Sequence, residues 1–215
     1  MAQYLIHAMP KRMWYVNDYL IPSMLQQGIS KDHIRVYNDV HGEGNLVSCL
    51  KSFLGCEGKG TWHLQDDVCI CKDFKVLTEA LDFGLVCGFS SELYDGPGKI
   101  GAVPRDKMWF SFPCIRIPDD YARACANWVN QYIIGNPVYE RYWGKGVNDD
   151  WAFRTWLKEF HPDDCAINLA PNLVDHVDYL LGGGTGKGKR DKPCRAQYWK
   201  DFDIVERLEE QINGR

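Results

Sequence analysis

Short apolar runs alternate with amphipathic segments along the first half of the chain. The runs are rich in β-branched and aromatic residues and predict strands over residues 4–8, 34–37, 60–64 and 85–87. Apolar residues at helical spacing predict helices over residues 11–28, 45–54 and 73–84. Pro22 is expected to kink or restart the first helix, because proline lacks a backbone N–H. Strands that alternate with helices predict an α/β fold with a mostly parallel sheet flanked by helices.

The second half of the chain has longer elements and longer connections. A loop rich in Gly, Pro and Asp is expected over 90–106, followed by a strand over 108–117. Helices are predicted over 119–132 and 150–160, because acidic residues at their starts precede apolar residues at helical spacing. These elements continue the α/β pattern.

The last part of the chain changes in composition. Residues 182–195 are rich in Gly, Lys and Arg and predict a mobile loop, and a short helix is expected over 201–212. A chain of 215 residues has the length of one sizeable domain. We therefore expect a single domain. Its main part spans residues 1–181, and the basic loop and final helix over 182–215 belong to the same domain.

Charge and cysteine content narrow the class of protein. A net charge of −4 gives no general attraction to nucleic acid. No stretch is apolar enough to span a membrane and the N-terminus lacks a signal-peptide pattern, so we expect a cytoplasmic protein without a membrane span. The nine cysteines are odd in number and mostly lie within apolar patterns, which favours reduced, packed thiols over a disulfide framework.

Two adjacent carboxylates, Asp66 and Asp67, follow the predicted strand over 60–64. Ligands of open α/β sheets bind at the carboxyl ends of strands. A carboxylate pair there can hold Mg²⁺ or Mn²⁺, which prefer oxygen ligands and bind together with substrate phosphates. The alternative is a solvated turn, and the position after a strand favours the metal site.

Three later features carry candidate chemistry. His176 follows the segment Pro171-Asn172-Leu173-Val174-Asp175 and offers an imidazole to a distant carboxylate site. Asp149 and Asp150 begin a predicted helix, where one can cap the helix while the other acts as a general base. The glycine-rich loop over 183–190 lacks the Ser or Thr of an ATP-binding loop, which excludes an ATPase. Its basic residues could neutralise a diphosphate, or the loop could be a solvated linker; these residues are Lys187, Lys189 and Arg190.

The order of these features resembles that of small bacterial and phage-like glycosyltransferases of the GT-A fold, a Rossmann-like architecture. Gln65-Asp66-Asp67 is similar to the acidic metal-binding segment of that group, with Gln65 in place of the first Asp. The segment that ends in His176 is similar to one whose histidine completes the metal site. The resemblance implies a metal site of Asp66, Asp67 and His176, with Asp66 also contacting the donor, and a catalytic base at Asp150 or Asp149, of which Asp150 is favoured. It also implies that Ala8, Arg12 and Asp39 lie near the nucleotide.

The expected activity is metal-dependent transfer of a sugar from a nucleotide-sugar, with UDP-sugar as the donor class and Mn²⁺ or Mg²⁺ as the cofactor. The acceptor, whether glycan, protein or modified nucleobase, and the oligomeric state stay open. A nucleotidyltransferase that acts on a sugar phosphate would use the same carboxylates. A non-catalytic carbohydrate-binding module would instead stack sugars on tryptophans, without metal or turnover, with Trp62, Trp109, Trp143 and Trp151 as candidates.

Overall fold

The computed structural model describes residues 1–89, 101–103, 112–137, 149–163, 166–169, 172–178 and 180–181. Within these ranges, the strands form a seven-stranded sheet in the order β2-β1-β3-β7-β5-β8-β6 and a two-stranded sheet of β4 and β9. The strands of the large sheet are β1 (Gln3–Ala8), β2 (Ile34–Asn38), β3 (Thr61–Gln65), β5 (Val86–Cys87), β6 (Gly101–Val103), β7 (Cys114–Ile117) and β8 (Ala166–Asn168). Those of the small sheet are β4 (Val68–Ile70) and β9 (Val174–His176).

Strand direction confirms the predicted α/β class. Strands β1, β2, β3, β5 and β8 run in one direction, and β6 and β7 run in the other. The sheet is therefore mixed but mostly parallel. Because β1, β2 and β3 are parallel neighbours, their carboxyl ends meet at one edge of the sheet.

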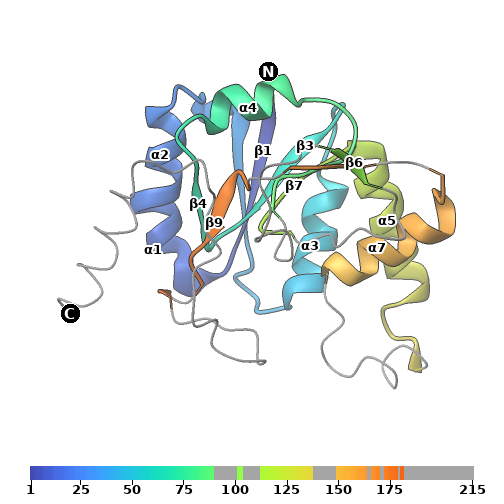
Figure 1. The fold of residues 1–215 in the computed structure, drawn as a ribbon. Coiled ribbons are helices and arrows are strands. Elements are labelled where there is room, and N and C mark those ends of the chain that lie inside the picture. The colour runs from blue at the N-terminus through green and yellow to red at the C-terminus, as the bar shows by residue number, and fades with distance from the viewer. Residues whose placement is uncertain are drawn as a thin grey trace.

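Helices cover both faces of the sheet (Figure 1). One face carries α1 (Met13–Tyr15), α2 (Ile21–Gln26) and α4 (Phe74–Ala80), and the other carries α3 (Asn45–Leu54), α5 (Asp119–Tyr132) and α7 (Asp149–Phe160). Short 3-10 turns, η1 (Pro10–Arg12) and η3 (Lys31–His33), precede α1 and β2.

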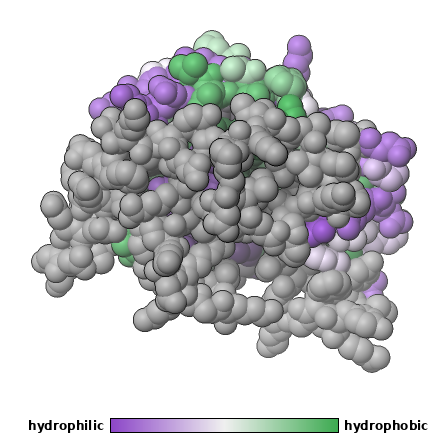
Figure 2. Space-filling view, viewed as in Figure 1, coloured by the Kyte–Doolittle hydropathy of each residue, from purple (hydrophilic) through white to green (hydrophobic). Residues whose placement is uncertain are grey.

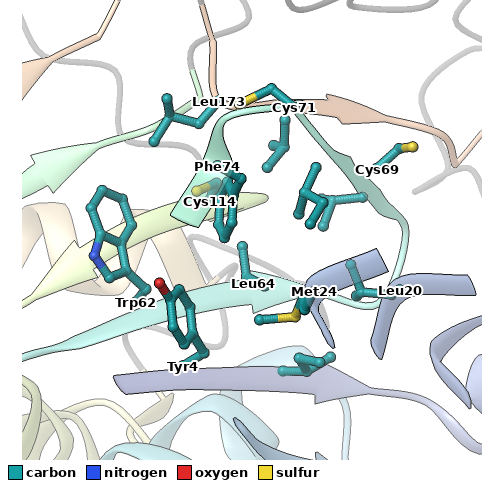
Figure 3. Close-up of a cluster of buried hydrophobic side chains, with 14 of the residues drawn as sticks. Tyr4, Leu20, Met24, Trp62, Leu64, Cys69, Cys71, Phe74, Cys114 and Leu173 are labelled. Carbon is teal, nitrogen blue, oxygen red and sulfur yellow. The ribbon is translucent and has the colours of Figure 1, made fainter. Parts of the chain in front are cut away.

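Each face of the sheet has its own hydrophobic core. The first lies between the sheet, the first helical segment and the small sheet, and Figure 3 shows Tyr4, Trp62 and Phe74 converging in it. The second packs α3, α5 and α7 against the sheet through Phe53, Phe153 and other apolar residues. The seven cysteines among the described residues are free and buried, as the sequence predicted.

Pro22 changes the winding of the first helical segment, as predicted. A π turn, η2 (Val16–Leu20), separates α1 from α2 and ends where Ile21 N donates to Val16 O. Because Pro22 has no N–H, the carbonyl four residues earlier cannot accept the usual helical hydrogen bond. The segment therefore continues as a helix but with a wider turn before the proline.

Several expectations about the second half need correction. The expected loop over 90–106 contains β6, and the expected strand over 108–117 begins within the described residues only at Cys114, because Phe112 and Pro113 form a turn. The pattern did not predict β4, β8 or β9. The basic loop and final helix expected over 182–215 lie outside the described residues, so the division at 181 stays a prediction.

Apolar side chains are exposed near α4. Figure 2 shows apolar side chains over α4, where Val76 and the nearby Phe83 are exposed. No helix in the described part of the chain is both long enough and apolar enough to cross a membrane.

Asp119, the first residue of α5, forms hydrogen bonds to residues at the start of β3. These bonds lead to a prediction about stability. Its carboxylate is buried and accepts hydrogen bonds from Gly58 N at 2.6 Å and from Thr61 Oγ1 at 2.8 Å. Asp119→Ala should lower the free energy of unfolding by about 3 kcal/mol, because two buried donors lose their acceptor. The neighbouring Asp120 is exposed and accepts a hydrogen bond from Tyr121 N, so Asp120→Ala should cost less than about 1 kcal/mol. Equal losses in urea unfolding would contradict this role for Asp119.

Candidate functional site

The carboxylate pair lies at the carboxyl edge of the sheet, immediately after β3. Parallel pairing of β1 with β3 places Met9, just beyond β1, beside Asp66. Met9 N donates a hydrogen bond to Asp66 Oδ2 at 2.6 Å, so the Asp66 side chain binds the backbone directly after β1. Both carboxylates are buried, with exposed fractions of 3% for Asp66 and 5% for Asp67. A solvated turn is therefore excluded.

Arg12 bridges the two carboxylates. It belongs to η1, which follows β1, and its Nη1 lies 2.7 Å from Asp66 Oδ1 and 2.5 Å from Asp67 Oδ2. Burial alone would lower the pKa of Arg12, but the charges of Asp67 and Asp66 outweigh burial and raise it. The guanidinium therefore stays charged in its buried position.

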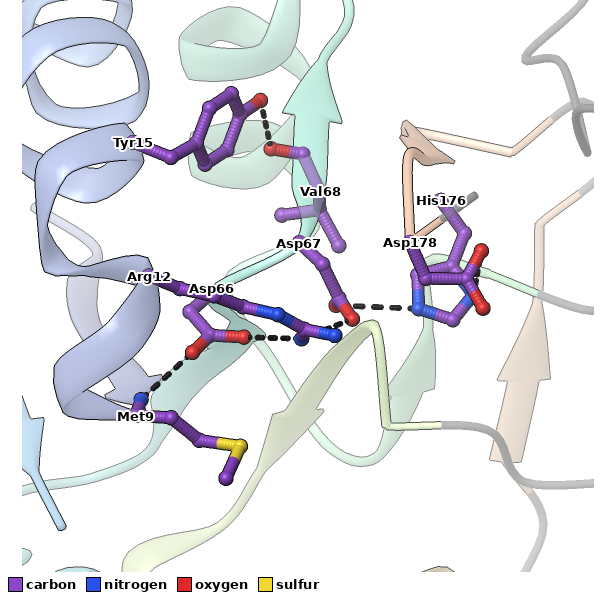
Figure 4. A network of polar contacts seen from close by, with 8 residues as sticks. All are labelled: Met9, Arg12, Tyr15, Asp66, Asp67, Val68, His176 and Asp178. Atoms are coloured by element: carbon purple, nitrogen blue, oxygen red, sulfur yellow. Dashed lines mark hydrogen bonds and ion pairs between the residues drawn. The ribbon is translucent and has the colours of Figure 1, made fainter. Parts of the chain in front are cut away.

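The small sheet brings His176 to Asp67 from far along the chain. Antiparallel pairing of β4 with β9 sets Val68 opposite His176, and Val177 N donates to Asp67 O at 2.7 Å. His176 Nε2 then lies 3.1 Å from Asp67 Oδ1, as Figure 4 shows. The sequence-based prediction that His176 joins the carboxylates agrees with this geometry.

Asp178 lies on the other side of the imidazole. Its Oδ1 is 3.8 Å from His176 Nδ1, and both residues are buried to an exposed fraction of 9%. A carboxylate beside one ring nitrogen directs the other nitrogen toward a metal ion in many metal sites. Sequence reasoning missed Asp178, although the spacing His-x-Asp was a visible signal.

The two carboxylates have opposite pKa shifts. Burial, followed by the charge of Asp67, raises the pKa of Asp66, and the bonds from Met9 and Arg12 only partly offset these effects. Burial also acts to raise the pKa of Asp67, but its contacts with His176 and Arg12 outweigh burial, and the pKa is lowered. Asp67 is therefore the more firmly ionised member of the pair.

The donor atoms fit a divalent cation with two protein ligands. Among the described residues, no group of three or more His, Cys, Asp and Glu side chains is placed to hold a metal ion. Asp67 Oδ1 and His176 Nε2, however, are 3.1 Å apart. Neighbouring ligands of one octahedral ion at about 2.1 Å are themselves about 3 Å apart. Mg²⁺-type ions commonly take one or two carboxylates and complete their shell with water and substrate phosphates.

Asp66 is less suited than Asp67 to direct ligation. Its two oxygens already accept hydrogen bonds: Oδ2 from Met9 N and Oδ1 from Arg12 Nη1. The first bond holds the backbone after β1, and the second holds the guanidinium. Asp67 presents Oδ1 toward His176 while Oδ2 contacts Arg12. Of the three predicted metal ligands, Asp67 and His176 have adjacent donor atoms, whereas both oxygens of Asp66 accept hydrogen bonds from other groups.

Asp149 and Asp150 begin α7, as the sequence indicated. Asp149 Oδ1 accepts from Asp150 N, and Asp150 Oδ1 accepts from Trp151 N, so both carboxylates bind backbone at the helix start. Burial, followed by the charge of Asp150, raises the pKa of Asp149 to about 7, and the charge of Asp67 adds to the shift. Burial also raises the pKa of Asp150, which has Arg154 as a partly offsetting charge.

Ala8 and Asp39 lie at the carboxyl edge of the sheet, as Asp66 and Asp67 do. Ala8 O accepts from Asp39 N at 2.8 Å, which joins the ends of β1 and β2. Asp39 is buried, and its two oxygens accept from Glu43 N and Gly44 N, at 2.9 and 3.0 Å. Asp39 thus shapes the loop before α3, close to the positions that the resemblance assigns to the nucleotide.

Other candidates lie elsewhere or outside the described residues. Lys187, Lys189 and Arg190 fall outside them, as do Trp109 and Trp143. Trp62 is fully buried and donates its Nε1–H to Thr78 O, so it cannot stack on a sugar. Sequence reasoning also missed Tyr15, whose hydroxyl donates to Val68 O at 2.8 Å and holds the backbone next to Asp67. No local sequence signal marks that contact.

Comparison with known proteins adds little to this geometry. No family model matches the sequence, and no curated protein is similar to it. The crystal structure of HddC from Yersinia pseudotuberculosis is similar over 58% of this chain and 80% of that chain, with 13% sequence identity and a TM-score of 0.32. A likeness with so low a TM-score does not indicate a function.

The opposite pKa shifts of the carboxylates yield a prediction about stability and pH, tested in EDTA. Asp67→Asn should cost about 3 kcal/mol at pH 7, because a buried ion pair is broken. The stabilisation by Asp67 is complete above its ordinary pKa of 3.8 and is lost as the pH falls through the lower folded value, so this cost should shrink in acid.

Asp66→Asn is the matched control and should show the opposite slope. Because the folded pKa of Asp66 is raised, the wild type loses stability relative to Asp66→Asn as the pH rises from 3.8 through the folded value. Urea unfolding from pH 3 to 7 measures both differences. Slopes of the same sign would show that the assigned environments are wrong.

Proposed function

We infer that the chain is a metal-dependent glycosyltransferase of the GT-A type, which transfers a sugar from a nucleotide-sugar, with UDP-sugar as the expected donor, to an acceptor hydroxyl. The observation that carries this proposal is the convergence of Asp67, His176 and Arg12 at the carboxyl edge of the sheet. These groups offer two ligands to a divalent cation and a guanidinium to an anion. A diphosphate needs both kinds of partner.

The chain's own residues have distinct parts in this activity. Asp67 and His176 would hold Mn²⁺ or Mg²⁺, which when bound supplies positive charge to the diphosphate of the donor. Arg12 adds a fixed charge next to that position. Met9 and Asp66 hold Arg12 and the end of β1 in place. Asp178 adds a negative charge 3.8 Å from the other ring nitrogen of His176.

For the general base we favour Asp149, whereas the sequence favoured Asp150. A base works best when its pKa is near the operating pH, and the pKa of Asp149 is raised to about 7. The charge of Asp67 also contributes to the raised pKa of Asp149. Asp150 instead interacts with Arg154, on its own helix. Asp149 would take the proton of the acceptor hydroxyl as that oxygen attacks the anomeric carbon and UDP departs.

The alternatives have less support. A nucleotidyltransferase could use the same cation site, and no contact among the described residues favours it over the glycosyltransferase. A carbohydrate-binding module loses its first candidate platform, because Trp62 is buried.

Product analysis tests the proposed reaction directly. With Mn²⁺ and a panel of UDP-sugars, we expect slow release of UDP with water as acceptor, and no release in EDTA. The same protein with nucleoside triphosphates and sugar phosphates should give no pyrophosphate. Pyrophosphate without UDP release would favour the nucleotidyltransferase instead.

The role of Asp149 yields a second prediction. Asp149→Asn should lower kcat about 100-fold or more with little change in donor affinity, because the base is lost while the donor site remains. Wild-type kcat/KM should rise with pH through about 7 as Asp149 loses its proton. Asp150→Asn is the control: it should keep most of kcat but move the midpoint of the pH profile below about 7, because the charge of Asp150 contributes to the raised pKa of Asp149.

The same substitution should stabilise the fold. The wild type loses stability as the pH rises from 3.8 to about 7, because the folded protein holds the proton of Asp149 more tightly than the unfolded chain does. An asparagine side chain at this position carries no charge, so Asp149→Asn should raise the melting temperature at pH 8 but not near pH 4. Lower activity without this gain would argue that Asp149 is not the desolvated base.

A further inference from the structure

Arg12 occupies the position of a cation in the carboxylate cluster. One nitrogen, Nη1, contacts an oxygen of each carboxylate, and all three side chains are buried. Asp67 contributes one oxygen to Arg12 and turns the other toward His176. The carboxylate best placed to ligate a metal ion is therefore already shared with a fixed positive charge.

Charge is poorly screened at a buried site, so this sharing has a large effect on other ions. Asp66 and Asp67 carry two negative charges and Arg12 carries one positive charge, which leaves one negative charge among the three groups in contact. A divalent cation added alone meets a carboxylate pair that is already half neutralised. An anionic diphosphate, in contrast, is attracted by both Arg12 and the cation.

We propose that Arg12 couples metal binding to nucleotide binding, because it weakens the site for a cation alone and strengthens it for a cation together with a diphosphate. The inference rests on the proposed function, since it assumes the cation site at Asp67 and His176. Its physical basis is linkage: a group that repels one ligand and attracts the other makes the two bind cooperatively, and the effect is reciprocal. Without Arg12, the cation should bind more tightly by itself and gain less from the nucleotide.

Binding of Mn²⁺ tests the coupling without any measurement of turnover. Free Mn²⁺ is measured by electron paramagnetic resonance during titration of wild type and Arg12→Gln, each with and without UDP. For Mn²⁺ alone, we expect Arg12→Gln to bind about 10-fold more tightly than wild type. UDP should tighten Mn²⁺ binding about 10-fold or more in wild type, and by a clearly smaller factor in Arg12→Gln.

Arg116→Gln is a matched control for loss of a buried arginine. Arg116 lies on β7, and its guanidinium binds Asp82 at 2.8 Å and Gly84 O at 2.6 Å. Asp82 and Gly84 precede β5 and so lie at the opposite edge of the sheet from Asp67. Arg116→Gln should leave both the affinity for Mn²⁺ and its response to UDP unchanged.

Loss of Arg12 leaves two buried carboxylates unneutralised, so stability must be followed together with binding. Arg12→Gln should be less stable than wild type in EDTA, and Mn²⁺ alone should raise its melting temperature more than that of wild type. If Arg12→Gln does not fold even with Mn²⁺, Arg12→Lys replaces it. Lysine keeps the charge, but its side chain is shorter than that of arginine and should contact the two carboxylates less well, so the same changes should appear with a smaller size.

The outcomes separate the inference from the proposed function. If Mn²⁺ binds wild type in the presence of UDP, but Arg12→Gln and Arg12→Lys bind Mn²⁺ alone no more tightly than wild type does, the coupling role of Arg12 is wrong and the metal site stands. If neither wild type nor variant binds Mn²⁺ with or without UDP, the metal-dependent function fails, and the inference fails with it.

Discussion

Pairing of β4 with β9 joins the two parts of the candidate site. Asp67 follows the third strand of the N-terminal half, whereas His176 lies near the end of the described chain. The register that sets Val68 opposite His176, together with the bond from Val177 N to Asp67 O, fixes the imidazole beside the carboxylate. Any change that shifts this pairing by one residue would turn His176 to the other face of the small sheet.

Around that pairing, the cluster at the sheet edge carries charge in a nearly closed environment. Asp66, Asp67, Arg12 and His176 are all buried, so each depends on the others for neutralisation. Such a cluster is a poor source of stability, because desolvation offsets most of the attraction between the charges. Its position where parallel strands end, rather than its contribution to folding, supports a binding role.

The sequence predicted those parts of the fold whose apolar pattern extends over several residues. The strands β1, β2 and β3 and the helices α3, α5 and α7 have long enough runs to reveal their period. The three-residue strands β4, β8 and β9 do not, and their pairing depends on contacts with distant segments. The small sheet that assembles the site was therefore the part least accessible to sequence reasoning.

The site shows the same division. A carboxylate pair after a strand and a late histidine were recognisable by residue type and position. Contact of Arg12 with both carboxylates depends on the register between β1 and β3, and the preference for Asp149 over Asp150, both half-buried, depends on the charges near each of them at the start of α7. Strand register and the charges around a side chain depend on segments that are distant in the sequence, so these assignments required the structure.

The most direct test of the account asks whether Asp67 and His176 share one cation. Electron spin echo modulation of Mn²⁺ bound with UDP detects coupling to the nitrogen of a ligating imidazole. We expect a single imidazole signal that disappears in His176→Gln and persists in His41→Gln, since His41 is an exposed loop residue. A Mn²⁺ complex without imidazole coupling, or one whose coupling survives in His176→Gln, would contradict the central claim.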